Sequence, residues 1–333
     1  MLLFGLWAGL AQAQNLPEAQ KAAQAKNWPK VVEILGPHLD KLKRDQIFML
    51  ALAHSETGNH LTAIKTYEAA LALNAKDVTA KRGIGIEYTK MEKDKEAMTA
   101  FREALAINKR YEPAYLEIAK IYERRTYKNK GRESKDTTYE LRLLFQDLID
   151  PQVGGHRKPV YISKLCELST LGGHYLKKGG SLEYCEEGIR VDPKEPKNYV
   201  YLAMTYKETG NAEKALENFK KAADSFARSE FAQLSLASYY QEQKNFVQSY
   251  KYFKRAHQAN ETSLPALQGL AVSCLEIQKP DEAYAALQAA CKIDKKITPI
   301  VRKATAMMHQ QKNTAWTNKF DTLADTCGLN EQP

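Results

Sequence analysis

The chain has 333 residues, a net charge of +9 and a charged-residue content of 27%. This composition argues against a long disordered chain. Past the N-terminal run no segment approaches the roughly 20 apolar residues of a membrane span, so we expect no transmembrane segment. The basic balance permits nucleic-acid binding, but no recognition motif supports it, and we do not expect a nucleic-acid partner.

The first residues, MLLFGLWAGLAQAQ, form a short apolar run that ends in Ala11-Gln12-Ala13. A small-x-small pattern after such a run is typical of a secretory cleavage site, so residues 1–13 are predicted to be a signal peptide. No Lys or Arg precedes the run, which leaves a buried first helix as the alternative. We favour export, with a start codon assigned too late, and therefore expect a soluble periplasmic or secreted protein.

Residues 14–125 carry a sequence repeat with a step of 34. The members of the two best copies are Ala63, Tyr67 and Ala70, followed by Ala97, Phe101 and Ala104. This period, with small and aromatic residues at fixed offsets, is typical of helix-turn-helix units that bury their apolar faces against neighbouring units. No segment alternates with period two, so strands are not predicted.

Residues 126–195 are irregular. The separation of Tyr122 and Tyr206 exceeds two repeat periods, so extra residues have been inserted between them. We predict that the segment ERRTYKNKGRESKD lengthens the turn between two helices. Its charges form a basic insertion, with Arg125, Lys128, Lys130 and Arg132 as members. This insertion could bind an acidic glycan or an anionic lipid surface; the alternative is a solvated loop, which is what charge runs usually are.

The five cysteines of an exported chain leave at least one thiol unpaired. Cys166 and Cys185 both lie in the irregular middle segment, and a disulfide between them would staple a glycine-rich hairpin. Alternatively, the cysteines are small core residues, the interpretation that we prefer for Cys274. His156 and His174 flank Cys166, but the spacing matches no zinc motif, so no metal site is predicted.

Residues 196–297 repeat most clearly. In YLAMTYKETGNAEKALENFKKA the informative positions are Leu202, Ala203, Tyr206, Gly210, Ala215, Phe219 and Ala222, and several recur one period later as Tyr240, Phe253 and Ala256. On these residues the chain resembles the tetratricopeptide repeat family. The resemblance implies an all-α solenoid of about eight or nine hairpins in a right-handed superhelix, with capping helices in residues 298–333.

No catalytic motif is present, so we expect neither an enzyme nor a cofactor. Repeat proteins usually bind on the concave face formed by the first helix of each hairpin, and the function predicted here is a scaffold that holds a peptide or helix of an envelope protein. The alternative is that neighbouring repeats or the end helices of the chain cover these positions. The predicted groove residues are Phe48, Leu52, Arg82, Ile86, Lys90, Leu116, Lys120, Arg124, Val200, Met204, Leu234 and Val272.

A second row of predicted groove positions is basic in the N-terminal block and acidic in the C-terminal one. Lys90 and Arg124 belong to the N-terminal block, whereas Glu208, Glu242 and Glu276 belong to the C-terminal one. Opposite charges at the two ends of a groove would set the direction in which a partner binds.

Overall fold

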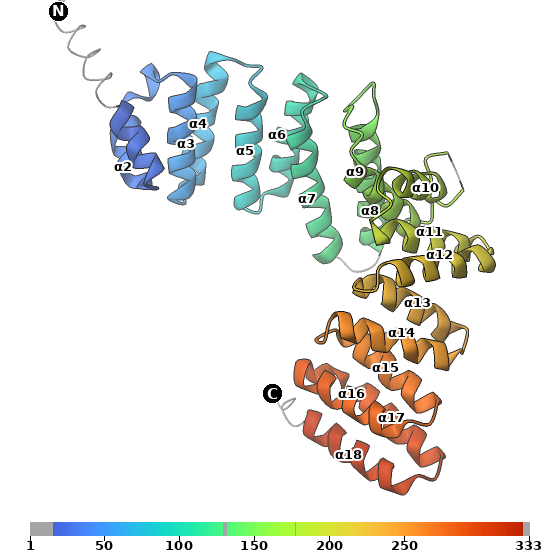
Figure 1. Cartoon of the computed structure of the whole chain (residues 1–333). Coiled ribbons are helices and arrows are strands. Elements are labelled where there is room, and N and C mark those ends of the chain that lie inside the picture. The colour runs from blue at the N-terminus through green and yellow to red at the C-terminus, as the bar shows by residue number, and fades with distance from the viewer. Residues whose placement is uncertain (1–15, 129–131, 177, 329–333) are drawn as a thin grey trace, which may run out of the picture. The chain divides into compact units, whose positions relative to one another are not determined.

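A computed structural model describes residues 16–128, 132–176 and 178–328, without the side chains of residues 126–135. Within these ranges the chain forms helices and turns only, and two compact units are present, Met1–Tyr161 and Ile162–Pro333. The all-α repeat fold predicted from the sequence is therefore confirmed. Figure 1 shows the helices of each unit side by side in chain order.

Unit 1 begins with a helix over residues 16–24. The elements that follow are α2 (Trp28–Leu35), a 3-10 helix η1 (Gly36–Lys41), α3 (Arg44–Glu56), α4 (His60–Leu73), α5 (Val78–Lys90), α6 (Asp94–Ile107), α7 (Glu112–Lys128) and α8 (Arg132–Ile149). Consecutive helices pair as hairpins, α3 with α4, α5 with α6 and α7 with α8.

Unit 2 contains most of α9 (Pro159–Leu171), which starts at the end of unit 1. The elements that follow are α10 (Ser181–Val191), α11 (Pro196–Glu208), α12 (Ala212–Ser225), α13 (Glu230–Glu242), α14 (Phe246–Ala259), α15 (Leu264–Glu276), α16 (Pro280–Ile293), η2 (Lys295–Ile297), α17 (Thr298–Gln310) and α18 (Thr314–Gly328). Hairpins pair α11 with α12, α13 with α14, α15 with α16 and α17 with α18.

The small residues of the repeat lie where helices cross. Ala203, Ala215 and Ala222 are completely buried, and Phe219 fills the space beside them. Ala237, Ala256, Ala271, Ala283 and Ala290 repeat this arrangement in the next two hairpins and are equally buried. Close approach of two helices requires small side chains, so the pattern encodes the spacing between helices.

The turn inside each hairpin also repeats. Gly210 has a φ of 82° and provides the turn between α11 and α12, as predicted. The corresponding positions adopt the same left-handed conformation in residues that are not glycine: Glu92, Lys244, Gln278 and Lys312, with φ between 56° and 59°. Since L residues rarely adopt this conformation, the packing of the paired helices must impose it.

The prediction that the extra residues near 123–136 lengthen a turn was wrong. They extend the two helices of that hairpin: α7 has 17 residues and α8 has 18, whereas α11 has 13 and α12 has 14. Additional helical turns satisfy their own backbone hydrogen bonds, which a longer loop leaves to the solvent.

Candidate functional site

The main candidate site is a hollow in unit 2, on the face formed by the first helices of four hairpins, α11, α13, α15 and α17; we call it the groove. It has a volume of 710 Å³. Its apolar lining comes from each of these helices and includes Met204, Phe231, Leu234, Val272 and Ile300. These side chains are neither fully buried nor fully exposed, so a partner that covers them would gain the free energy of apolar burial.

Two phenylalanines of the second helices reach the floor of the groove. Phe219 of α12 and Phe253 of α14 line it and are 3% exposed. Phe253 can do so because position 269 is glycine: a Cβ there would overlap its ring. Gly269 therefore lets an aromatic ring of the core form part of the groove surface.

Three of the predicted groove residues, Met204, Leu234 and Val272, lie in this lining. Val200 does not, because it is completely buried in the core of unit 2, and its prediction as a groove residue was wrong. The sequence reasoning did not include Ile300 and Lys303 of α17, which also line the groove. One repeat period after the predicted stripe positions Gln268 and Val272 come Arg302 and Ala306, so the predicted stripe does not reach them. Lys303 instead holds the register position of Ser235 and Gly269, which also line the groove.

The rim of the groove is polar. Lys207 of α11 and Glu242 of α13 form an ion pair with 2.5 Å between Nζ and Oε2. Glu208 and Lys303 are exposed and form no hydrogen bond or ion pair with any residue that the structure describes. The remaining polar lining consists of neutral side chains, Ser235, Ser238, Gln241 and Gln268.

The corresponding face of unit 1 has a different character, because its cations are paired with acids of the same unit. Arg82 Nη2 lies 2.7 Å from Glu117 Oε1, and Lys120 Nζ lies 3.1 Å from the other oxygen of Glu117. Lys90 bonds Ser55 and lies 3.6 Å from the buried Glu87. These predicted groove cations thus already have partners.

Arg124 and Arg125 share one acid. Both guanidinium groups bond Asp94, the first residue of α6. Arg125, predicted to belong to the basic insertion, and Arg124, predicted to lie in the groove, are therefore both paired within unit 1. The side chains of Lys128, Lys130 and Arg132 lie outside the described residues, so the structure does not test the rest of the insertion.

The apolar groove residues predicted in unit 1 are only partly available. Phe48 packs edge-on against Tyr67, with 5.4 Å between the ring centroids, and Arg44 covers its ring at 4.4 Å. Leu52 is 42% exposed, while Ile86 and Leu116 are half-buried.

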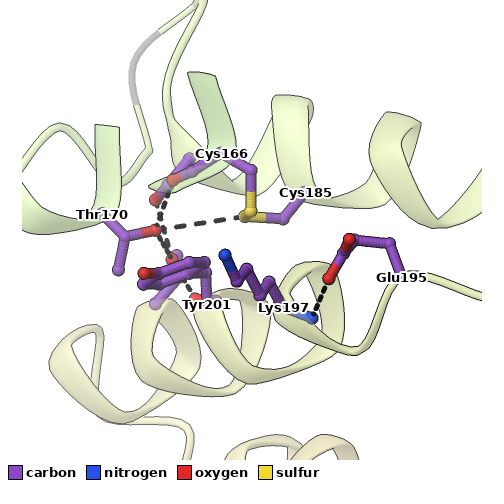
Figure 2. Close-up of a disulfide and its surroundings, with 8 residues drawn as sticks. Cys166, Thr170, Cys185, Glu195, Lys197 and Tyr201 are labelled. Atoms are coloured by element: carbon purple, nitrogen blue, oxygen red, sulfur yellow. Dashed lines mark hydrogen bonds between the residues drawn. A yellow bond between two sulfur atoms is a disulfide. The ribbon is translucent and has the colours of Figure 1, made fainter. Parts of the chain in front are cut away.

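Four cysteines of unit 2 form disulfides. Cys166 of α9 bonds Cys185 of α10, the pair that the sequence suggested (Figure 2). Thr170 Oγ1 lies 3.3 Å from Thr205 Oγ1 of α11, so the stapled hairpin also bonds the next one. The sequence reasoning missed the second disulfide, Cys291–Cys327, which ties α18 to α16.

Cys274 is the free cysteine and is completely buried, which agrees with its interpretation as a core residue. Burial raises the pKa of its thiol to about 12. The thiol therefore stays protonated and unreactive near neutral pH. Among the described residues no group of three His, Cys, Asp or Glu side chains is arranged to hold a metal ion.

Comparison with known proteins gives the family of the repeats. Residues 47–77 in unit 1 and 196–226 in unit 2 match the tetratricopeptide repeat family. The chain thus carries tetratricopeptide repeats in both units, and such repeats form scaffolds that bind other proteins. No curated protein matches the sequence. In the described part of the chain, every helix is too short or too polar to cross a membrane.

Several solved structures resemble the chain at low identity. A MamA protein is 16% identical, with a TM-score of 0.43, over 53% of this chain and 96% of MamA. Yeast Tom70 is 12% identical, with a TM-score of 0.41, over 96% of this chain and 77% of Tom70. A human IFIT1 dimer with m7Gppp-AAAA is 15% identical, with a TM-score of 0.42, over 85% of this chain and 68% of IFIT1.

Proposed function

We propose that this tetratricopeptide-repeat chain is an exported scaffold that holds a segment of an envelope protein in the groove of unit 2. The observation that carries the proposal is the apolar lining, drawn from four successive first helices around Met204, Leu234 and Val272. Met204, Phe231 and Leu234 pack against the core of unit 2 and yet remain partly exposed, so a partner can still cover them. A surface of this kind is typical of sites that bind a peptide or a helix.

The binding test uses a library of random peptides displayed on phage and selected on the full chain. Peptides that bind wild type should lose at least about tenfold in affinity when Leu234→Asp places a charge in the groove. Val247→Asp is the matched control, because Val247 is 64% exposed on α14 and lies outside the lining. Selected peptides that bind L234D as tightly as V247D would refute the groove as the binding site.

Export is a separate part of the proposal and has its own test. It is supported by the N-terminal pattern and by the two disulfides of unit 2, since disulfides persist in oxidising compartments. Residues 1–30, fused to a phosphatase that is active only after export, should give activity that residues 14–30 do not. Equal activity from both fusions would contradict export, and the proposal would then be reduced to the scaffold function.

The alternative function, binding of an acidic glycan or an anionic lipid through the basic insertion, has less support. Arg125 and its neighbour Arg124 both bond Asp94, so these two cations have a structural role within unit 1. Retention of the wild-type chain on anionic vesicles, lost when Lys128 and Lys130 are changed to Glu, would restore this alternative.

A further inference from the structure

Three successive first helices of unit 2 end in a carboxylate. Glu208 is the last residue of α11, Glu242 of α13 and Glu276 of α15, each one repeat period after the one before. The C-terminal end of a helix carries a partial negative charge, so a carboxylate there opposes the helix dipole. Folding alone does not favour this acidic row, which suggests that it serves recognition.

The acidic row is largely uncompensated. Within the described ranges only Glu242 is paired, through Lys207. Glu208 and Glu276 are exposed and bond no residue that the structure describes. At the corresponding positions of unit 1 stand Glu56, Lys90 and Arg124: Lys90 lies 4.0 Å from Glu56 and 3.6 Å from Glu87, and Arg124 bonds Asp94. The two units therefore differ at one register position, where unit 2 offers charges that a partner can neutralise.

The lining contains two cations: Lys207, which pairs with Glu242 of the row, and Lys303, which lies away from it. Lys303 is seven residues before Gln310, the residue that ends α17. Seven residues of helix span about 10 Å, so Lys303 lies about that far along α17 from the position where the row would continue. The groove thus has an apolar floor with Glu208 and Glu242 in its lining, and Glu276 continues the acidic row beyond that lining.

Resting on the proposed function, we infer that the occupant of the groove is an amphipathic helix with Lys or Arg residues along one side of its apolar face. An amphipathic helix presents adjoining apolar and charged stripes along its length, which match the floor and the acidic row. An extended strand would direct alternate side chains to opposite faces and leave its basic groups pointing away. First helices of adjacent repeats pack about 8–10 Å apart, close to two turns of a partner helix.

Two probe peptides test this inference. Both are helices of about 18 residues with the same leucine face, and the polar face is lysine in one and glutamate in the other. Each carries a fluorophore, and its anisotropy is measured as the full chain is added. We expect the lysine peptide to bind at least about tenfold more tightly, and the difference to shrink as salt is raised. Because the chain has a net charge of +9, non-specific attraction would favour the glutamate peptide. A preference for the lysine peptide would therefore report binding at the groove.

The test variant is Glu208→Lys combined with Glu276→Lys, which should abolish or reverse the preference for lysine. The control changes two exposed acids that belong neither to the groove lining nor to the acidic row, Glu261→Lys and Asp321→Lys, and should keep the wild-type preference. The control adds the same net charge, so a loss of preference in both variants would overturn the inference.

Other outcomes separate this inference from the proposed function. If wild type binds both peptides equally, and Leu234→Asp weakens both, the groove binds helices but the charge inference is wrong. If neither peptide binds at millimolar concentrations of the chain, the inference and its premise both fail. Preference for the glutamate peptide in wild type would also overturn the inference.

Discussion

The two units share one repeat register but use it in different ways. On the first-helix face of unit 1, Arg82, Lys90 and Arg124 each bond an acid of the same unit, so little charge remains for a partner. On the same face of unit 2, apolar side chains surround a 710 Å³ hollow, and two of the three carboxylates of the acidic row, Glu208 and Glu276, bond no described residue. The repeat thus fixes the positions of the helices. The residues that packing does not require decide whether the first-helix face has side chains available to a partner.

The largest expected difference between the units concerns the redox state. All five cysteines follow residue 161, so a reductant should destabilise unit 2 and leave unit 1 unchanged. Closing loops of 19 and 36 residues is expected to stabilise unit 2 by about 3 kcal/mol for each disulfide. Hydrogen exchange, measured for each unit with and without dithiothreitol, checks this. Cys274→Ser should not change the response to reductant. Equal loss of protection in both units would contradict the prediction that the disulfides stabilise unit 2 alone.

A second prediction uses the glycines that lie against aromatic rings. Gly269→Ala forces Phe253 to move and should destabilise unit 2 by about 1–3 kcal/mol, while Gly85→Ala should do the same to unit 1 by displacing Phe101. Since repeat units couple mainly to their neighbours, each variant should affect its own unit, which urea unfolding followed by hydrogen exchange can resolve.

The control for this prediction is Ser235→Ala. Ser235 lies one repeat period before Gly269, in the equivalent position, and already carries a Cβ, so its replacement should hardly change stability. G269A, unlike G85A, should also weaken peptide binding in the groove, because Phe253 lines it. Equal loss of peptide binding in G85A would show that the two units do not act separately.

A third prediction concerns the crossing of α10 and α11, where two residues depart from the repeat together. Gly188 stands where later repeats have Ala222 and Ala256, and Asn198 stands where they have Ala232 and Ala266. A Cβ on Gly188 would lie 2.8 Å from the Asn198 side chain, which is completely buried and forms no hydrogen bond with any described residue. Gly188→Ala alone should be destabilising, whereas G188A combined with Asn198→Ala recreates the standard alanine pair.

The double-mutant cycle should therefore give a favourable coupling of about 1 kcal/mol, measured as free energies of unfolding in urea. Independent, additive effects of the two changes would show that the glycine and the asparagine do not compensate each other.

The smallest expected effect is a gain. Removing the carboxylates at the ends of α11 and α15 with Glu208→Gln and Glu276→Gln should stabilise unit 2 by about 0.3–1 kcal/mol for each site, because each opposes a helix dipole. Thermal unfolding at low salt measures this gain, and added salt should reduce it. If the variant binds the lysine peptide more weakly while melting higher, then the acidic row lowers stability and supports binding. A lower melting temperature would mean that these carboxylates have stabilising contacts.

Much of the fold follows from local pattern. The repeat register located the buried alanines, Phe219 and the turn at Gly210, because small residues at helix crossings and aromatic residues beside them are fixed by the geometry of each hairpin. The register also brought Met204, Leu234 and Val272 to one face, and the structure places all three in the groove. The repeat pattern did not show that Val200, another predicted groove residue, would be buried in the core of unit 2.

The sequence by itself determined the repeat, the paired helices and the type of residue at each packing position, since these depend on contacts within a hairpin and between adjacent hairpins. The tertiary structure alone decided which side chains remain available to a partner. Ion pairs such as Arg82–Glu117 and Arg124–Asp94, and the disulfide Cys291–Cys327, join residues about one repeat period apart. Whether such groups meet depends on side-chain directions across neighbouring helices, which spacing along the chain does not specify.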